Sequence, residues 1–328
     1  MTAHGENFNS AIKRRKIDPG QDETESSFKV ECVLSKEVTG HVDLVEMIAC
    51  PILNKKDTAS LVRELSSLFP IHSSHLKRVS NNKGELCILI CSSNDTKITN
   101  GFENIHNDLE SLGIKNHKAL GSPRLVKVAK TAAMTRKQFE EAKSHWPLTF
   151  HENKELEKKL SGHYFSFENL SVIREHIKMA IATAENSSSK IKRGAVVVDP
   201  KTNTVITTSD DKRHEHPLHH AAMVAIDSVA KGQQSLNQEQ PCPSSESAAT
   251  NKTKSDAPYL CTGYDIFLTH EPCVMCAMAL VHSRANRIFF CIPHPDGAIY
   301  SHYKLHTISS LNHHFEVFKV NHSIPNLT

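Results

Sequence analysis

Two cysteines and one histidine in the C-terminal half of the chain constrain its fold most strongly. Cys273 and Cys276 follow Pro272 at the expected start of a helix, so that both thiols project from one helical face. His220 lies in the expected first turn of an earlier helix and can bring its imidazole to the same point. One histidine and two cysteines match the ligand preference of zinc and leave a fourth tetrahedral position open. We therefore predict a Zn²⁺ site where two helix N-termini converge.

The neighbouring His219 makes the choice of histidine ligand a question of register. Zinc-dependent nucleobase deaminases carry the pattern H-x-E followed by P-C-x-x-C, in which the Glu moves protons. His220 is in register with that histidine, and the Glu position then falls on Ala222. A methyl group cannot take a proton from water or pass it to a ring nitrogen. We predict His220, Cys273 and Cys276 as metal ligands in a chain that does not perform the reaction by itself.

Composition indicates an intracellular protein of about two domains. The chain has 328 residues and a net charge of +3, so any affinity for nucleic acid must come from local patches. There are nine cysteines and no secretory segment near Met1. Five cysteines in apolar, strand-like surroundings are expected to be reduced core thiols: Cys32, Cys50, Cys87, Cys91 and Cys291. No apolar run approaches the roughly 18 residues of a membrane span.

Residues 1–26 are polar and are expected to form a disordered tail. Four consecutive basic residues, Lys13 to Lys16, interrupt this tail. Such a run suits a nuclear import receptor or an RNA backbone, although it is also common as an ordinary solvated charge run. The expected localisation is the nucleus and the cytoplasm.

Residues 27–134 alternate between strand and helix patterns, which predicts a ferredoxin-like α/β domain. The expected elements are a strand at Leu44–Cys50, a helix at Asp57–Phe69, a strand at Leu86–Cys91, a helix at Gly101–Leu112 and a strand at Arg124–Val128. A helical linker rich in Lys and Glu is expected over residues 135–161.

Residues 162–328 are expected to form a second α/β domain with one mixed sheet and helices on both faces. Ser166 can cap the first helix, and a hairpin turns around Asp199–Asn203. Pro217 is expected to open the second helix, which ends near Gly232. Residues 233–257 contain Cys242 and are expected to be a disordered insertion. Two short strands at 266–268 and 287–292 flank the helix of the cysteine pair.

Five segments of this domain carry a resemblance to a known family: His216–Met223, Tyr259–Asp265, Glu271–Arg284, Asp296–Ala298 and Leu311–Val317. They resemble the non-catalytic subunit of eukaryotic tRNA adenosine deaminase, in the cytidine/deoxycytidylate deaminase superfamily. The resemblance covers about residues 163–320. The N-terminal domain resembles the family in layout only.

The resemblance implies a cytidine-deaminase-like α/β/α domain, a bound Zn²⁺ and a heterodimer with a catalytic subunit. That heterodimer binds tRNA and converts adenosine to inosine at the wobble position of the anticodon. The family carries a small apolar residue at the Glu position, as Ala222 does here, whereas His219 departs from the Leu-like residue expected beside the ligand. A free carboxylate at Thr328 is one candidate for the fourth zinc position.

Binding of a folded tRNA also requires basic surface, because A-form RNA is recognised mainly by shape and backbone. Each basic candidate could equally be an ordinary solvated charge. The candidates are Lys77, Arg78, Lys83, Arg124, Lys127, Lys130, Lys190, Lys192 and Arg193.

Two other functions are compatible with the sequence. The chain could be an autonomous zinc deaminase that recruits Glu215 or Glu271 as its proton shuttle. Deamination by the purified chain alone would identify this case. It could also be a stand-alone RNA-binding protein with a relic zinc fold, which predicts a monomer without a deaminase partner.

Overall fold

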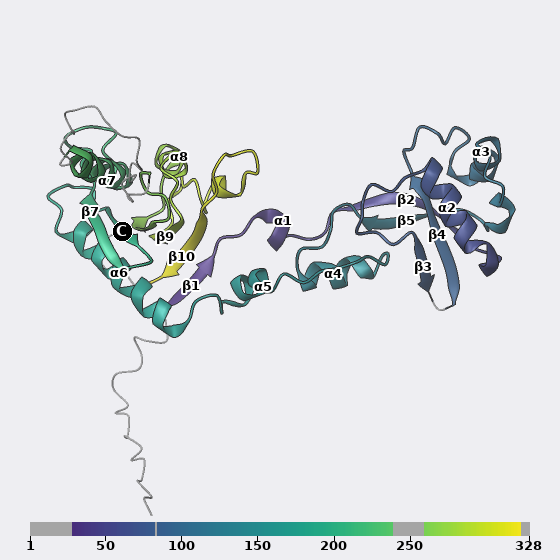
Figure 1. Ribbon diagram of the computed structural model, residues 1–328, viewed down its shortest axis with the longest axis horizontal. Coiled ribbons are helices and arrows are strands. Elements are labelled where there is room, and N and C mark those ends of the chain that lie inside the picture. The colour runs from purple at the N-terminus through teal and green to yellow at the C-terminus, as the bar shows by residue number, and fades with distance from the viewer. Residues whose placement is uncertain (1–27, 83, 239–258, 323–328) are drawn as a thin grey trace, which may run out of the picture. The chain divides into compact units, whose positions relative to one another are not determined.

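The structure is a computed structural model that describes residues 28–82, 84–238 and 259–322 (Figure 1). The described chain divides into two compact units: Leu34–Tyr164 forms one, and the residues up to Val33 join those from Phe165 onward in the other. The predicted basic tail, Lys83, most of the predicted insertion with Cys242, and Thr328 lie outside the described residues. Within the described ranges no helix is both long and apolar enough to cross a membrane.

The N-terminal unit has the strand and helix order of a ferredoxin-like fold, β-α-β-β-α-β. Its elements are β2 (Leu44–Pro51), α2 (Thr58–Leu68), β3 (Val79–Asn82), β4 (Glu85–Ser92), α3 (Ile105–Ser111) and β5 (Arg124–Ala129), preceded by the short α1 (Lys36–Thr39). The sheet order is β3-β4-β2-β5, and all neighbouring strands are antiparallel. This topology is consistent with the predicted ferredoxin-like layout. The prediction missed β3, which is short and ends in two exposed asparagines.

Helices α2 and α3 bury one face of this sheet. Leu61 and Leu65 of α2 and Leu109 of α3 pack in one core cluster with Ile48 and Ile88 of the central strands. All five side chains are fully buried. The apolar spacing on α2 that predicted a helix therefore serves this core, and Pro70 follows directly after its end.

The other face of the sheet is covered by the segment that was predicted to be a linker. Trp146 packs with Ala49, Cys87 and Leu89, and its indole N–H donates a 2.7 Å hydrogen bond to the carbonyl oxygen of Lys77. Helices α4 (Arg136–Lys143) and α5 (Lys154–Ser161) belong to the same compact unit. The predicted boundary at residue 134 is therefore misplaced, because it would cut Trp146 out of the core that it completes.

The C-terminal unit is built on a six-stranded mixed sheet in the order β1-β10-β9-β8-β6-β7. Its strands are β1 (Lys29–Cys32), β6 (Gly194–Asp199), β7 (Thr204–Asp210), β8 (Asp265–His270), β9 (Arg287–Ile292) and β10 (Glu316–Asn321). Strands β8, β9 and β10 are parallel, and the other pairs are antiparallel. The predicted mixed sheet is confirmed, with β10 added. Strand β1, expected in the N-terminal domain, instead pairs with β10.

Helices cover both faces of this sheet, as predicted. Helix α6 (Phe167–Glu185) begins at Ser166, whose side chain accepts a hydrogen bond from the N–H of Asn169. Close packing against the sheet requires Gly194, since a Cβ there would lie 2.2 Å from the carbonyl oxygen of Ala180 in α6. Helices α7 (Ala221–Gln238) and α8 (Val274–His282) share a core cluster with the opposite face.

Helix α7 starts later and ends later than predicted. Pro217 lies in a turn, closed by a 2.9 Å hydrogen bond from the N–H of His219 to the carbonyl of His216, rather than in the helix. Proline disfavours the helical conformation for the residue before it, and here the chain completes a turn before the helix begins. His220 thus immediately precedes α7, and its carbonyl accepts the N–H of Val224 at 3.0 Å. The helix continues through Gly232 to Gln238.

Candidate metal centre

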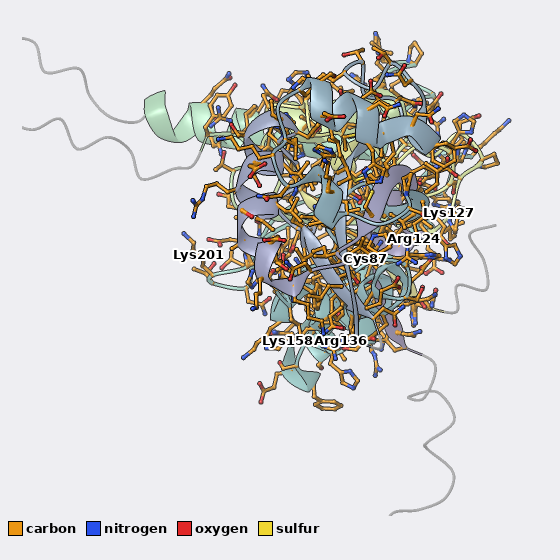
Figure 2. The ribbon with its side chains drawn as sticks, turned by 90° about the vertical axis from the view of Figure 1, so that its right-hand side faces the viewer. Cys87, Arg124, Lys127, Arg136, Lys158 and Lys201 are labelled. Carbon is orange, nitrogen blue, oxygen red and sulfur yellow. The ribbon has the colours of Figure 1, made fainter. Side chains whose placement is uncertain are left out.

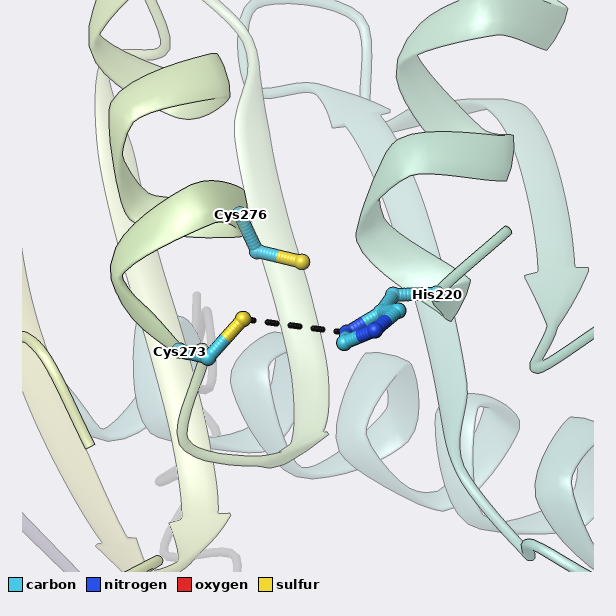
Figure 3. A group of neighbouring side chains, drawn as sticks. All are labelled: His220, Cys273 and Cys276. Carbon is cyan, nitrogen blue, oxygen red and sulfur yellow. Dashed lines mark hydrogen bonds between the residues drawn. The ribbon is translucent and has the colours of Figure 1, made fainter. Parts of the chain in front are cut away.

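Two helix N-termini bring His220, Cys273 and Cys276 together (Figure 3). His220 immediately precedes α7, Cys273 is the N-cap of α8, and Cys276 lies in the first turn of α8. Their ligand atoms all lie within 4.8 Å of one another, and Cys273 Sγ is 3.7 Å from His220 Nδ1. The three residues of the sequence motif therefore converge at one place in the fold.

The separation of Cys273 and His220 matches a tetrahedral zinc site, and all three donors lie within 4.8 Å of one another. With Zn–S near 2.3 Å and Zn–N near 2.0 Å, a tetrahedral S···N separation is about 3.5 Å. The observed 3.7 Å between Cys273 Sγ and His220 Nδ1 is close to that value. The cavity beside the triad measures about 30 Å³, which leaves room for only one or two water molecules.

The pKa values of the two cysteine thiols are shifted in opposite directions. The pKa of Cys273 is lowered to about 5, first by the hydrogen bond that the Cys276 thiol donates and also by backbone N–H groups and nearby His220, against the opposing effect of burial. The same hydrogen bond, together with burial, raises the pKa of Cys276. One thiolate is therefore already formed near neutral pH, and a metal ion has to displace only the remaining thiol proton.

The second histidine of the pair does not join this group. The side chain of His219 is exposed and lies beside His216, with 4.8 Å between the ring centroids. Among the described residues, His220, Cys273 and Cys276 form the group of histidine, cysteine and acidic side chains that could hold a metal ion. This geometry favours the register that placed Ala222 at the Glu position.

Ala222 is buried and lines the cavity, so no carboxylate occupies the position of the proton shuttle. The one aspartate in the wall, Asp211, is fully buried and engaged. It accepts hydrogen bonds from Arg213 Nε at 2.9 and 3.0 Å. Arg193 completes this wall, and burial lowers its pKa. Asp211 and Arg213 could not be predicted as part of the site, because they lie in a polar stretch without a recognisable motif.

Glu271, one of the two alternative proton shuttles, has a different role. Its buried carboxylate accepts hydrogen bonds from the backbone N–H groups of His294, Ile299, Tyr300 and Ser301 at 2.6 to 3.2 Å. A Cβ at Gly297 would lie 2.0 Å from the carboxyl carbon, so only glycine fits against it. Glu271 is also among the residues that line the cavity, but its carboxylate is engaged in holding the loop after β9.

The other alternative shuttle, Glu215, does not line the cavity. Its side chain is exposed in the turn before α7, where it lies 3.5 Å from His214. Of the two alternative acids, only Glu271 lines the cavity, and its carboxylate is occupied by backbone N–H groups of the loop after β9.

The basic candidates in the N-terminal unit fall into two groups. Lys77, Arg124, Lys127 and Lys130 are exposed. Arg124 and Lys127, which are labelled in Figure 2, belong to the edge strand β5. Arg78 does not fit the prediction of an RNA contact: its guanidinium donates to the carbonyls of Leu65, Phe69 and Ile90 at 2.8 to 3.1 Å. Burial also lowers its pKa to about 10.

The basic candidates near the first hairpin differ in the same way. Lys190 is exposed. Lys192 is partly buried and donates to the carbonyls of Glu185 and Ser187. Arg193 is half-buried in the wall of the metal cavity. Of these three side chains, Lys190 is thus the most accessible to an external partner.

The mixed sheet, the triad at two helix N-termini and the buried alanine define the class of the C-terminal unit. It has the metal-ligand arrangement of the zinc-dependent nucleobase deaminases, with Ala222 in place of the proton-transferring glutamate. A family model described as the cytidine and deoxycytidylate deaminase zinc-binding region matches residues 170–292. A second model, the N-terminal domain of tRNA-specific adenosine deaminase TAD3, matches residues 45–146.

Full-length similarity identifies the family more narrowly. The chain is 39% identical to a "probable inactive tRNA-specific adenosine deaminase-like protein 3" of Danio rerio, over 91% of this chain and 93% of that protein. It is 32% identical to "tRNA-specific adenosine deaminase subunit tad3" of Schizosaccharomyces pombe, over 75% and 72% of the two chains. The chain belongs to the TAD3 family of tRNA-specific adenosine deaminase proteins. A solved chain from a study of tRNA:A34 deaminases aligns at 22% identity and a TM-score of 0.34, over 44% of this chain and 97% of that one.

Proposed function

We propose that this chain is the non-catalytic subunit of a heterodimeric tRNA adenosine deaminase, which converts adenosine to inosine at the wobble position. The observation that carries the proposal is Ala222, which leaves an otherwise assembled deaminase site without an acid that can move protons. The names of the relatives support it: one is called a deaminase subunit, and another is called probably inactive.

Within this proposal His220, Cys273 and Cys276 hold Zn²⁺. In an active deaminase the ion activates the water that attacks the base. In this chain the ligands tie the start of α7 to the start of α8, so the ion has a structural role. The three ligands of this chain therefore stabilise its fold, whereas the catalytic partner supplies the glutamate that moves protons.

The N-terminal unit is proposed to contribute tRNA affinity through its exposed cations. A deaminase acting on a folded RNA needs contacts to the backbone beyond the reacting base. Lys77, Arg124, Lys127 and Lys130 are accessible for such contacts. We propose the nucleus and the cytoplasm as its location. A tRNA substrate and the basic run from Lys13 to Lys16, which is typical of a nuclear import signal, both support this proposal.

The decisive experiment compares the chain alone, the catalytic partner alone and the two together. Purification from its source cells should yield a complex with a deaminase that carries an intact H-x-E motif. Inosine should form in tRNA only when both chains are present. Deamination by this chain alone would instead establish an autonomous enzyme. A free monomer, whose depletion leaves wobble inosine unchanged, would favour a stand-alone RNA-binding protein.

A further inference from the structure

A loop beside the metal ligands exposes aromatic side chains that the triad does not use, and partly buried lysines lie beside them. It connects β9 to β10 and is drawn in yellow-green near α8 in Figure 1. Tyr300 and Tyr303 are 37% and 51% exposed, and His302 between them is exposed as well. Lys304 follows in the sequence, and the Lys319 ammonium lies 4.7 Å from the centre of the Tyr300 ring. We call these five residues the aromatic loop surface.

The backbone under this surface is fixed before any partner binds. Glu271 accepts the N–H groups of Tyr300 and Ser301, and the carbonyl of Gly297 accepts those of His302 and Tyr303 at 3.1 and 3.2 Å. A loop that is already ordered loses little conformational entropy when it binds. The exposed rings are therefore presented on a rigid base.

Exposed rings next to cations are suited to unpaired nucleic-acid bases. Each base has a flat π-face that stacks on a tyrosine or histidine ring, while lysines neutralise the adjoining phosphates. Base-paired RNA hides these faces, so such a surface selects single-stranded segments. Residues 294–304 contain a single carboxylate, that of Asp296. Tyrosines also suit protein interfaces, but Lys304 and Lys319 beside the rings favour a polyanion.

The surface is linked to the metal-ligand turn. The N–H of Ala298 donates a 2.9 Å hydrogen bond to the carbonyl of Pro272, and Cys273 pairs with Gly297 in an isolated bridge. We propose that the aromatic loop surface stacks unpaired bases of the tRNA anticodon loop. This rests on the proposed function and deepens it, because it names the part of the RNA that the deaminase-like unit itself contacts.

The test uses the complex of the full chain with its catalytic partner and two RNA probes. One probe is an anticodon stem-loop with 2-aminopurine at unpaired positions, and the other is a fully paired duplex of equal charge. Tyr303→Ala should weaken binding of the stem-loop about 5- to 150-fold, the loss expected for one base–ring stack. It should also restore 2-aminopurine fluorescence that the wild type quenches. Binding of the duplex should not change.

Two variants serve as controls. Tyr303→Phe keeps the ring and should bind the stem-loop like the wild type, within about twofold. Tyr259→Ala removes another exposed tyrosine of the same unit, 66% exposed and outside the loop, and should have no effect. An equal loss from Tyr259→Ala would show that the effect is not local and would overturn the proposal.

The outcomes separate this proposal from the function on which it rests. If the wild-type complex binds and deaminates tRNA but Tyr303→Ala changes neither binding nor fluorescence, the stacking surface is refuted and the subunit function stands. If the wild-type complex does not deaminate tRNA, the proposed function itself fails. If Tyr303→Ala separates the two chains in the absence of RNA, the loop is a protein interface and the stacking proposal is overturned.

Discussion

Ala222 shows how one side chain can change the role of a site whose other parts remain. Its methyl group lines the cavity beside the three metal ligands, and the acids nearby are engaged elsewhere. Asp211 is paired with Arg213, and Glu271 binds backbone N–H groups. The site can therefore keep a structural ion while it lacks the glutamate that would move a proton.

Restoring the glutamate should not restore the enzyme. A general acid–base contributes about 10²- to 10⁴-fold only when the substrate lies within hydrogen-bond reach. A site that no longer catalyses has no reason to keep a cavity shaped to a base, and the one beside Ala222 is small, about 30 Å³. Single-turnover assays of Ala222→Glu, in complex with a partner whose own catalytic Glu is removed, should therefore give no inosine above background. Robust turnover would mean that the loss of one side chain alone had silenced the site.

Loss of a ligand should remove the metal and destabilise the C-terminal unit. In Cys276→Ser, metal analysis should fall from about one Zn²⁺ per chain to a small fraction, because a hydroxyl is a poor substitute for a thiolate. The unfolding temperature should drop to that of the chelator-treated wild type and should no longer respond to chelator. Cys291→Ser, another buried cysteine, should keep its metal. Full zinc occupancy in Cys276→Ser would remove Cys276 from the ligand set.

At the scale of elements, the sequence predicted those whose signals are local. The cap at Ser166 and the turn at Asp199–Asn203 sufficed for α6 and the first hairpin. Strand β1 could not be predicted in its sheet, because its partner β10 is so distant in the sequence: Asn321, which donates a side-chain hydrogen bond to Glu31, lies 290 residues further along the chain. The role of Glu271 was not predicted either. Its position between an apolar strand and the metal-ligand cysteines was nevertheless a sign that its carboxylate would be buried.

His306 links two distant segments of the C-terminal unit and should make its stability depend on pH. Its Nε2 lies 2.9 Å from the carbonyl oxygen of Val33, and its Nδ1 is buried without a hydrogen-bond partner among the described residues. Burial lowers its pKa below the ordinary value of 6.5. The unfolded chain therefore takes up a proton first as the pH falls, and the free energy of unfolding decreases below pH 6.5.

Denaturant unfolding between pH 8 and pH 5 measures this effect. The contribution of His306 should approach about 1.4 kcal/mol per pH unit at most. His306→Gln, which cannot take up the proton, should show a shallower pH dependence than the wild type. His302→Gln, an exposed neighbour, should follow the wild type. Identical slopes for wild type and His306→Gln would assign the pH dependence to other groups.

At the scale of the whole molecule, the N-terminal unit is an insertion within the C-terminal one. Strand β1 precedes it and α6 follows it, and both belong to the deaminase-like unit. A deletion that starts at the first residue therefore removes more than an RNA-binding domain. It also takes away the edge strand that covers β10, and an unpaired edge promotes aggregation.

An excision that keeps β1 should separate these two effects. Replacing residues 34–164 by a flexible linker should weaken tRNA binding and flatten its dependence on salt, because fewer phosphates are neutralised. Pairing with the catalytic partner should persist. Deletion of residues 1–164 should show the same loss of RNA affinity and, in addition, a lower unfolding temperature. An unchanged salt slope after the excision would place the phosphate contacts outside the N-terminal unit.

The pairing of β1 with β10 also sets an order of events during synthesis. At 5–20 residues per second, the ribosome needs roughly 15 to 60 s to make the 290 residues between Glu31 and Asn321. The inserted unit emerges complete within that interval and can close its own sheet. Strand β1 must stay without its partner strand during this time. A chaperone that shields β1 on the nascent chain would therefore protect the strand that waits longest for its partner.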